Sequence, residues 1–154
     1  MRVYFKVFGK AKSKDRPRFD SRNKITYTPK KTVNYEQEIK SAYIEASGGR
    51  NVFGEKSVLM VVVEHKVIPK SFSKKKKQMV LNDEIFPTTP PDYDNVAKIV
   101  SDALNGLAYK DDKQVIAFSD KVYSKNDMAY LEVFMIERKA SYKKDLFDII
   151  TKCY

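Results

Sequence analysis

The stretch Ser57–Val67, SVLMVVVEHKV, is a clear strand signal. It is rich in β-branched residues, which favour the pleated backbone of a strand. Apolar residues occupy consecutive positions in its middle, where a strand with one solvated face would alternate apolar with polar residues. We therefore expect a strand whose middle is buried on both faces, with the remaining elements arranged around it.

Three further segments are expected to form strands. Residues 2–8 alternate apolar and polar side chains, which is typical of a half-buried strand. Residues 115–123 and 129–136 are expected to pair as a hairpin around the sequence SKND. The basic segment 9–24 is expected to be a long loop, followed by a short edge strand in 25–29.

Four segments are expected to form helices. The first runs from Thr32 to the Gly48-Gly49 pair, and its apolar face is formed by Tyr35, Ile39, Ala42 and Ala46. A short helix with a serine cap is expected within 71–83, and another begins at 92–94 and ends near Gly106. Ser141 is expected to cap a final helix over 141–154. This order of elements predicts one compact α+β domain over 1–154, with a small mixed β-sheet packed with helices.

The charge of the chain suggests a polyanionic partner. Thirty Lys and Arg stand against 20 Asp and Glu among 154 residues, which gives a formal net charge of +10. Nucleic acid is therefore the leading candidate. The single cysteine, Cys153, cannot form an internal disulfide, which fits a reducing compartment. The chain shows neither an apolar run of about 20 residues nor a signal peptide, so we expect a cytoplasmic protein without membrane contact.

Acidic residues nevertheless gather in PPDYDNVAKIVSDALNGLAYKDDKQV, residues 90–115, which contains Asp92, Asp94, Asp102, Asp111 and Asp112. Singly, they have structural explanations: a helix cap, an i, i+4 pair with Lys98, and a turn before a strand. Together, they match the few carboxylate oxygens that Mg²⁺ binds beside water and substrate phosphate. A neighbouring lysine would offset the negative charge that develops on a phosphoryl group. The combination favours metal-assisted chemistry on phosphodiesters.

This stretch resembles the RusA-type Holliday junction resolvases, a family often carried by prophages. The family core reads Asp-x-Asp-Asn-x-x-Lys, then Asp-Ala-Leu, then Asp-Asp-x-Gln-Val. Here these motifs are DYDNVAK at 92–98, DAL at 102–104 and DDKQV at 111–115, in the same order. The segments RPRF at 16–19 and YTPKKT at 27–32 also resemble the family, so that the resemblance covers most of residues 1–137. Residues 141–154 lie outside it.

The resemblance implies a Mg²⁺-dependent endodeoxyribonuclease that resolves four-way DNA junctions by symmetric phosphodiester hydrolysis, in recombination and repair in a bacterial host. It implies three metal-binding catalytic carboxylates, Asp92, Asp94 and Asp112. Lys98 is then the charge-stabilising catalytic lysine, while Asp102 and Asp111 support the metal ligands from beside them. Mn²⁺ is expected to substitute for Mg²⁺, and no small-molecule cofactor is expected. The family is dimeric, and two symmetric cuts require two active sites.

Basic residues near the N-terminus are expected to contact DNA phosphates: Lys14, Arg16, Arg18, Lys30 and Lys31. Lys74 to Lys77 span every face of a helix turn, so that solvated surface and DNA contact are both open for them. Two other functions are also open at this point. One is a non-catalytic module that binds branched DNA, and the other is a nuclease that acts on flaps or other branched forms.

Overall fold

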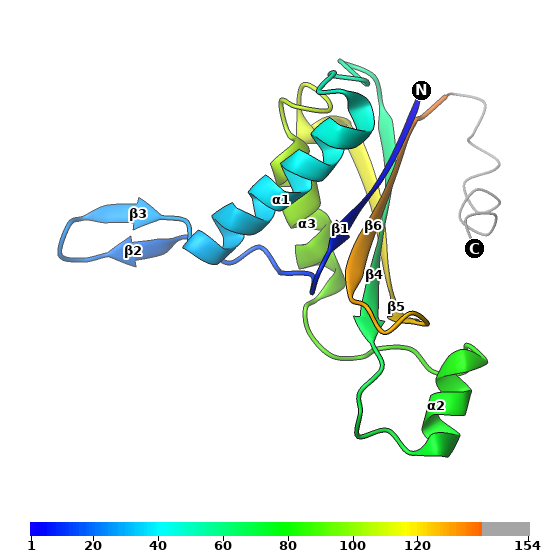
Figure 1. Ribbon diagram of the computed structural model, residues 1–154. Helices are drawn as coiled ribbons and strands as arrows, with labels where there is room; N and C mark the ends of the chain where they lie inside the picture. Colours follow the sequence, from blue (N-terminus) through cyan, green and yellow to red (C-terminus); the bar gives the residue numbers. More distant parts are fainter. Residues whose placement is uncertain (140–154) are drawn as a thin grey trace.

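The centre of the fold is β4 (Val58–Val67). A computed structural model describes residues 1–139, so the helix predicted over 141–154 lies outside the described residues. β4 belongs to a four-stranded sheet in the order β1-β6-β4-β5 (Figure 1), with β1 at Arg2–Phe8, β5 at Val115–Ser124 and β6 at Tyr130–Glu137. β4 pairs in parallel with β5 and antiparallel with β6, and β6 is antiparallel to β1. The predicted mixed sheet is therefore confirmed.

β4 is buried on both faces, as its sequence predicts. Its first seven residues are all buried. Val58, Met60 and Val62 point into the main core, while the alternate residues, such as Val61 and Val63, face a cavity on the other side of the sheet. The period of two residues along a strand explains this division.

The predicted hairpin between 115–123 and 129–136 is wrong, because β4 lies between β5 and β6. All ten residues of β4 pair with β5, from Val58 opposite Val115 to Val67 opposite Ser124. The chain that links β5 to β6 therefore crosses the end of β4, a span of two strand spacings or about 10 Å. Five residues, 125–129, are long enough for that span.

Helices α1 (Lys30–Ser47) and α3 (Tyr93–Leu104) cover one face of the sheet (Figure 1). α1 packs on β1 and α3, and α3 also packs on β5. The buried face of α1 consists of Thr32, Tyr35, Ile39, Tyr43 and Ser47. Ala46, which was expected on this face, is exposed, since the 3.6-residue repeat brings Tyr43 and Ser47 toward the core instead. Gly48 ends the helix in the left-handed conformation, at φ 66°.

The basic segment that was expected to be a loop contains a strand. β2 (Arg18–Asp20) pairs with β3 (Ile25–Tyr27) in a separate two-stranded sheet. The Asp20 carboxylate builds the turn by accepting from the backbone N–H groups of Arg22 and Asn23 and from the Asn23 side chain. We call residues 16–27 the arm, because in Figure 1 this hairpin projects away from the rest of the protein beside the start of α1.

The predicted short helix is α2 (Lys74–Leu81), and Ser73 caps it by accepting from the Lys76 N–H at 3.2 Å. Lys74 to Lys77 are exposed on it. Phe72 is anchored rather than free. Its ring meets the Tyr123 ring edge-on with 5.8 Å between centroids, and Lys76 Nζ lies 4.0 Å from its centroid.

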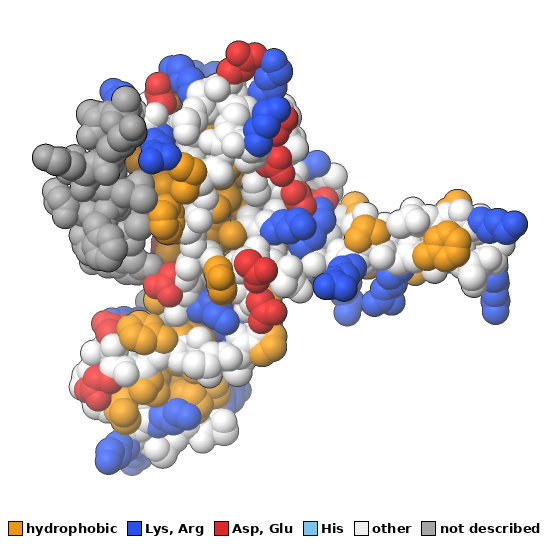
Figure 2. Space-filling view, turned by 180° about the vertical axis from the view of Figure 1, so that it is seen from behind, with side chains coloured by type: hydrophobic (Ala, Val, Ile, Leu, Met, Phe, Trp, Pro, Cys, Tyr) orange, Lys and Arg blue, Asp and Glu red, His pale blue; other side chains and the backbone are white. Residues whose placement is uncertain are grey.

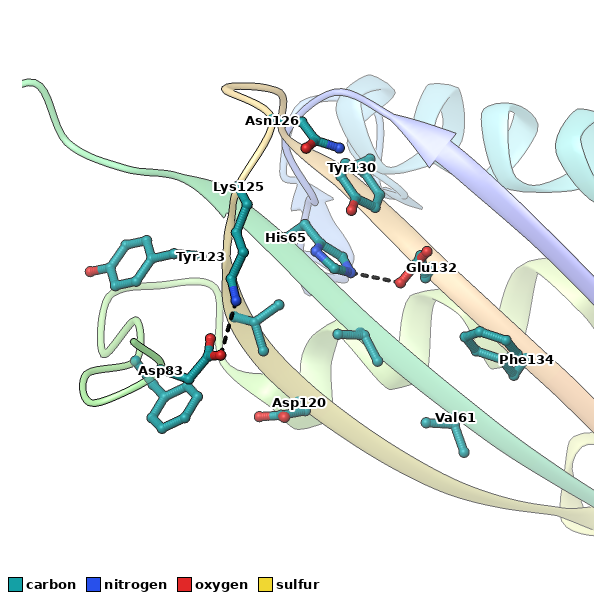
Figure 3. A pocket seen from close by; sticks show the side chains of 13 residues that line it. Val61, His65, Asp83, Asp120, Tyr123, Lys125, Asn126, Tyr130, Glu132 and Phe134 are labelled. Atoms are coloured by element: carbon teal, nitrogen blue, oxygen red, sulfur yellow. Dashed lines mark hydrogen bonds and ion pairs between the residues drawn. The ribbon is translucent and has the colours of Figure 1, made fainter. Parts of the chain in front are cut away.

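The sheet face opposite α1 and α3 carries a cavity of about 660 Å³ (Figure 3). His65 lies at its edge, where its ring stacks on Tyr130 with centroids 4.0 Å apart. His65 Nε2 also lies 2.7 Å from Glu132 Oε2. Burial of Glu132 opposes its ionisation, but hydrogen bonds from Tyr4, Lys6 and His65 outweigh this and lower its pKa. The only histidine is thus a structural partner of Glu132, on the opposite face of the sheet from α3.

Candidate active site

Two of the predicted metal ligands lie at the start of α3. Asp92 is the N-cap residue, but its side chain makes no capping hydrogen bond, and Asp94 lies in the first helical turn. Both residues are exposed. Within residues 1–139, neither carboxylate forms an ion pair or side-chain hydrogen bond. Uncommitted carboxylates at a helix N-terminus keep their oxygens available for a ligand outside the chain.

The backbone leading into Asp92 is held by side chains from two strands. We call residues 89–91 the connector. Lys121 Nζ, from β5, donates to the carbonyls of Thr89 at 3.2 Å and Pro91 at 3.1 Å. Lys66 Nζ, from β4, donates to the carbonyls of Thr89 and Pro90. These contacts fix the position at which α3 begins.

Ser119 adds a further contact to the start of α3. Its hydroxyl, on β5, donates to the carbonyl of Tyr93 at 3.0 Å. Tyr93 lies between the two aspartates in the sequence. The polar side chains of β5 therefore reach both the connector and the first residue of the helix.

A buried carboxylate lies beneath the connector. The Glu64 side chain is only 5% exposed, and its Oε1 lies 3.7 Å from Lys66 Nζ. Its Oε2 has no hydrogen-bond partner among the described residues. Burial raises the pKa of Glu64, and the nearby charges of Lys66 and Lys121 oppose this shift. The Glu64 carboxylate thus lies close to the ammonium groups of Lys66 and Lys121 and balances part of their positive charge.

Lys98 lies one turn after Asp94 on α3 and is exposed. The i, i+4 ion pair between Lys98 and Asp94 that the spacing permits is absent from the ion pairs of residues 1–139. Its ammonium group is therefore uncommitted, like the carboxylates of Asp92 and Asp94. An unpaired lysine at this position suits contact with a phosphate.

Asp102 has a different environment, because it forms an ion pair. Its Oδ2 lies 3.0 Å from Lys14 Nζ, which also lies 2.6 Å from Glu36 Oε1. Burial lowers the pKa of Lys14, but the hydrogen bonds that it donates to Glu36 and Asp102 outweigh this effect and raise the pKa. The Lys14 N–H also donates to the carbonyl of Asn95 at 3.4 Å. Lys14 therefore ties the segment before the arm to α1 and α3, and its expected contact with DNA stays a prediction.

Asp111 and Asp112 differ in their side-chain contacts, whereas Asp92 and Asp94 are alike in forming no ion pair or side-chain hydrogen bond with the described part of the chain. Asp111 caps the 3₁₀ helix η1 (Asp112–Gln114) in a capping box with Gln114, and its Oδ2 lies 3.0 Å from Lys113 Nζ. Hydrogen bonds from the Lys113 backbone and side chain lower the pKa of Asp111. Asp112 is exposed and has no ion pair within residues 1–139. Asp111 therefore has a capping role, whereas Asp112 forms no ion pair among the described residues and interacts with the Asp111 carboxylate.

Asp112 lies toward the last turns of α3. The Tyr109 hydroxyl donates to the Ser101 carbonyl at 2.7 Å, and burial and the charges of Asp112 and Asp102 raise the pKa of Tyr109. Asp92 and Asp94 lie at the other end of this 12-residue helix, which is about 18 Å long. Accordingly, within residues 1–139 no three Asp, Glu, His or Cys side chains are grouped closely enough to hold a metal ion.

The donor chemistry at the start of α3 still suits a hard dication. Mg²⁺ is commonly bound through one or two carboxylates, with water and substrate phosphate in its other positions. Asp92 and Asp94 offer two uncommitted carboxylates on a held backbone. These two residues fit such an ion, and a third carboxylate from η1 is not gathered with them.

The predicted DNA-binding residues are divided between two places. Arg16 and Arg18 are exposed in the arm, and Lys30 and Lys31 are exposed at the start of α1. Figure 2 shows Lys and Arg side chains along the arm and at its tip, while acidic side chains gather on the body of the protein. Lys and Arg side chains also lie beside acidic ones on the body, so the arm is the part of this view whose charge is almost entirely basic.

Glu64, Lys66, Lys121 and Ser119 are functional candidates that the sequence reading missed. The sequence feature that could have identified them is a polar residue inside a segment that otherwise has the apolar or alternating pattern of a strand. Glu64 and Lys121 face each other across the parallel pair of β4 and β5. Because that pairing was not predicted, their proximity could not be inferred.

The fold and the site now define a class of protein: an α+β domain that offers uncommitted carboxylates and a lysine on one helix, beside a basic arm. The family model described as Endodeoxyribonuclease RusA matches residues 9–135. The chain therefore belongs to the RusA endodeoxyribonuclease family and is a hydrolase that acts on DNA. It is also similar to an uncharacterized protein, YqaN, of Bacillus subtilis (strain 168), with 36% identity over 127 residues, covering 79% of this chain and 88% of that protein. No helix within residues 1–139 has the length and apolar character needed to cross a membrane.

Proposed function

We propose that this protein is a Mg²⁺-dependent endonuclease that resolves four-way DNA junctions by symmetric cuts and acts as a homodimer. The observation that carries the proposal is the start of α3. There, Asp92, Asp94 and Lys98 have no ion-pair partner among residues 1–139, although the backbone that bears them is held by Lys66, Lys121 and Ser119. Holding a backbone while leaving its charged side chains uncommitted is typical of a site prepared for a ligand.

Asp92 and Asp94 would hold the metal ion, with Mn²⁺ as an acceptable substitute. Asp112, the third ligand that the family resemblance implies, lies near the last turns of α3 and is not gathered with them within residues 1–139. When bound, such an ion polarises the phosphodiester and lowers the pKa of an attacking water. Lys98 would place its ammonium group against the phosphoryl oxygens and offset the charge that develops there. The capping role of Asp111 and the ion pair of Asp102 leave both residues with structural tasks around these ligands.

DNA would be drawn in by the basic residues that remain exposed. Arg16, Arg18, Lys30 and Lys31 can contact phosphates, and each such contact makes binding more sensitive to salt. Two symmetric cuts in a junction with near two-fold symmetry require two copies of the site, which a homodimer supplies.

The proposal is tested by cleavage of a synthetic four-way junction in Mg²⁺. Wild type should nick opposing strands symmetrically, EDTA should stop the reaction, and Asp94→Asn should give no product above background. Asp127→Asn is a matched control, because Asp127 is exposed in the β5–β6 turn and its positive φ of 53° is one that asparagine tolerates. A panel with flaps and three-way branches separates junction resolution from cleavage of other branched DNA.

A further inference from the structure

The arm has two properties that its own folding does not explain. Apart from Asp20, each of residues 16–27 is exposed, and β2 and β3 pair only with each other. Large apolar side chains are among them: Phe19 is 64% exposed, Ile25 55% and Tyr27 46%. A two-stranded hairpin with strands of three residues is at best marginally stable alone in water. Contact with a partner would cover the apolar groups and stabilise the hairpin.

The charge of the arm indicates which partner. It carries Arg16, Arg18, Arg22 and Lys24 against a single acidic residue, Asp20. The Asp20 carboxylate is occupied by the three hydrogen bonds of the turn, which lower its pKa. The outward-facing charge is therefore almost entirely positive, which is complementary to a nucleic acid backbone. A two-stranded ribbon also has dimensions that fit the major groove of DNA.

The strand register assigns side chains to the two faces of the arm. Arg18 lies directly opposite Tyr27, and Asp20 opposite Ile25. Residues directly opposite in an antiparallel pair share a face, so Arg18, Asp20, Ile25 and Tyr27 lie on one face, where the Asp20 carboxylate is held by the turn. Phe19, opposite Thr26, lies on the other. One face thus combines an arginine, an aromatic ring and a β-branched aliphatic side chain.

The base of the arm is tied to the candidate active site. Lys14, two residues before the arm, donates its N–H to Asn95, which follows Asp94, and its ammonium group pairs with Glu36 and Asp102. Each strand and its half of the turn span about 20 Å at 3.3 Å per residue. DNA held at Asp94 is therefore within reach of the arm.

We propose that the face formed by Arg18, Ile25 and Tyr27 recognises the branch point of DNA, with Tyr27 stacking on a base and Arg18 contacting the adjacent phosphate. This inference rests on the proposed function, because it concerns how that nuclease selects its substrate. Unstacking a base step in a continuous duplex costs a few kcal/mol. At a branch point, stacking is already interrupted, so an aromatic side chain meets a base face at lower cost. The arm thereby favours branched over linear DNA through shape, without reading sequence.

The test compares binding of a four-way junction and a linear duplex of the same length by full-length protein in EDTA, where no cleavage occurs. Tyr27→Ala should raise the Kd for the junction about tenfold, as expected for the loss of one base–aromatic stack, and change the duplex Kd less than about twofold. Phe19→Ala is the matched control on the opposite face and should preserve the preference for the junction. Arg18→Ala should weaken binding to both DNAs and reduce the salt dependence.

A second readout separates stacking from a general loss of affinity. A fluorescent base analogue, 2-aminopurine, whose emission is quenched by stacking, should dim when placed at the branch and bound by wild type, and should stay bright when Tyr27→Ala binds at saturating concentration. Unchanged junction preference in Tyr27→Ala, or its loss in Phe19→Ala instead, would overturn the inference. A wild type that prefers junctions through Tyr27 but never cuts them would overturn the proposed nuclease and leave the arm's role standing.

Discussion

Replacing Lys121 by methionine should loosen the connector that leads into α3. In wild type, Lys121 Nζ donates to the carbonyls of Thr89 and Pro91, and Lys66 Nζ reaches Thr89 as well. Thr89 thus keeps a donor in the variant, whereas Pro91 loses the one donor that the described residues give it. Leaving one partly buried carbonyl unpaired costs about 1–3 kcal/mol. We therefore expect the free energy of unfolding to fall by about 2 kcal/mol, which lowers Tm by about 4–8 °C for a chain of this size.

Thermal melting followed by circular dichroism measures this loss, and junction cleavage measures its effect on the site. Lys121→Arg should retain most of both, because it keeps a cationic donor. Lys125→Met is the matched control, because it makes the same substitution four residues further along the chain. The ion pair of Lys125 with Asp83 is exposed on both sides, so its loss should cost at most about 1 kcal/mol. If Lys121→Met melts no lower than Lys125→Met, the connector is not held as described.

Two more predictions concern Lys14 and Glu64, whose interactions join segments far apart in the chain. Lys14→Met should lower the free energy of unfolding by about 1 kcal/mol through the loss of its ion pairs, with little change in the salt dependence of DNA binding. Arg16→Ala should leave the free energy of unfolding nearly unchanged and reduce the salt dependence of DNA binding. Comparing melting curves with salt titrations of DNA binding distinguishes the two. The pKa of Glu64 is raised in the folded state, so wild type loses free energy of unfolding as pH rises from the ordinary glutamate pKa of 4.5 through the folded-state pKa. Glutamine does not ionise, so the stability of Glu64→Gln relative to wild type should increase over the same pH range. Urea unfolding across a pH series would contradict this if the difference between the two proteins did not change with pH.

Much of the fold is local enough to be predicted from sequence. The consecutive apolar residues of β4 indicated burial on both faces, and Ser73 and the Gly48-Gly49 pair marked helix ends correctly. The sheet order could not be predicted, because the turn signal SKND suggests a hairpin wherever it joins two strands. What decides the order is that β4 has enough apolar surface to occupy the interior position between β5 and β6.

The candidate site was predicted as a set of residues rather than as a geometry. Sequence spacing placed Asp92, Asp94 and Lys98 on one helix, and they lie there. Spacing alone could not distinguish Asp111 from Asp112, although the family resemblance implied Asp112 as the ligand; the capping box that engages Asp111 depends on the conformation of Gln114. Nor could it show that Lys14 is occupied by ion pairs, because these join residues far apart in the chain.

Cleavage of a synthetic four-way junction by wild type and Asp94→Asn, side by side in Mg²⁺, tests the central claim most directly. Asp94 is exposed and forms no ion pair within residues 1–139, so the substitution should change Tm by only a few degrees, through the lost charge at the helix N-terminus. Wild type should give two symmetric nicks, and Asp94→Asn should bind the junction but yield no product above background. Cleavage by Asp94→Asn at the wild-type rate would contradict the assignment of the active site to the start of α3.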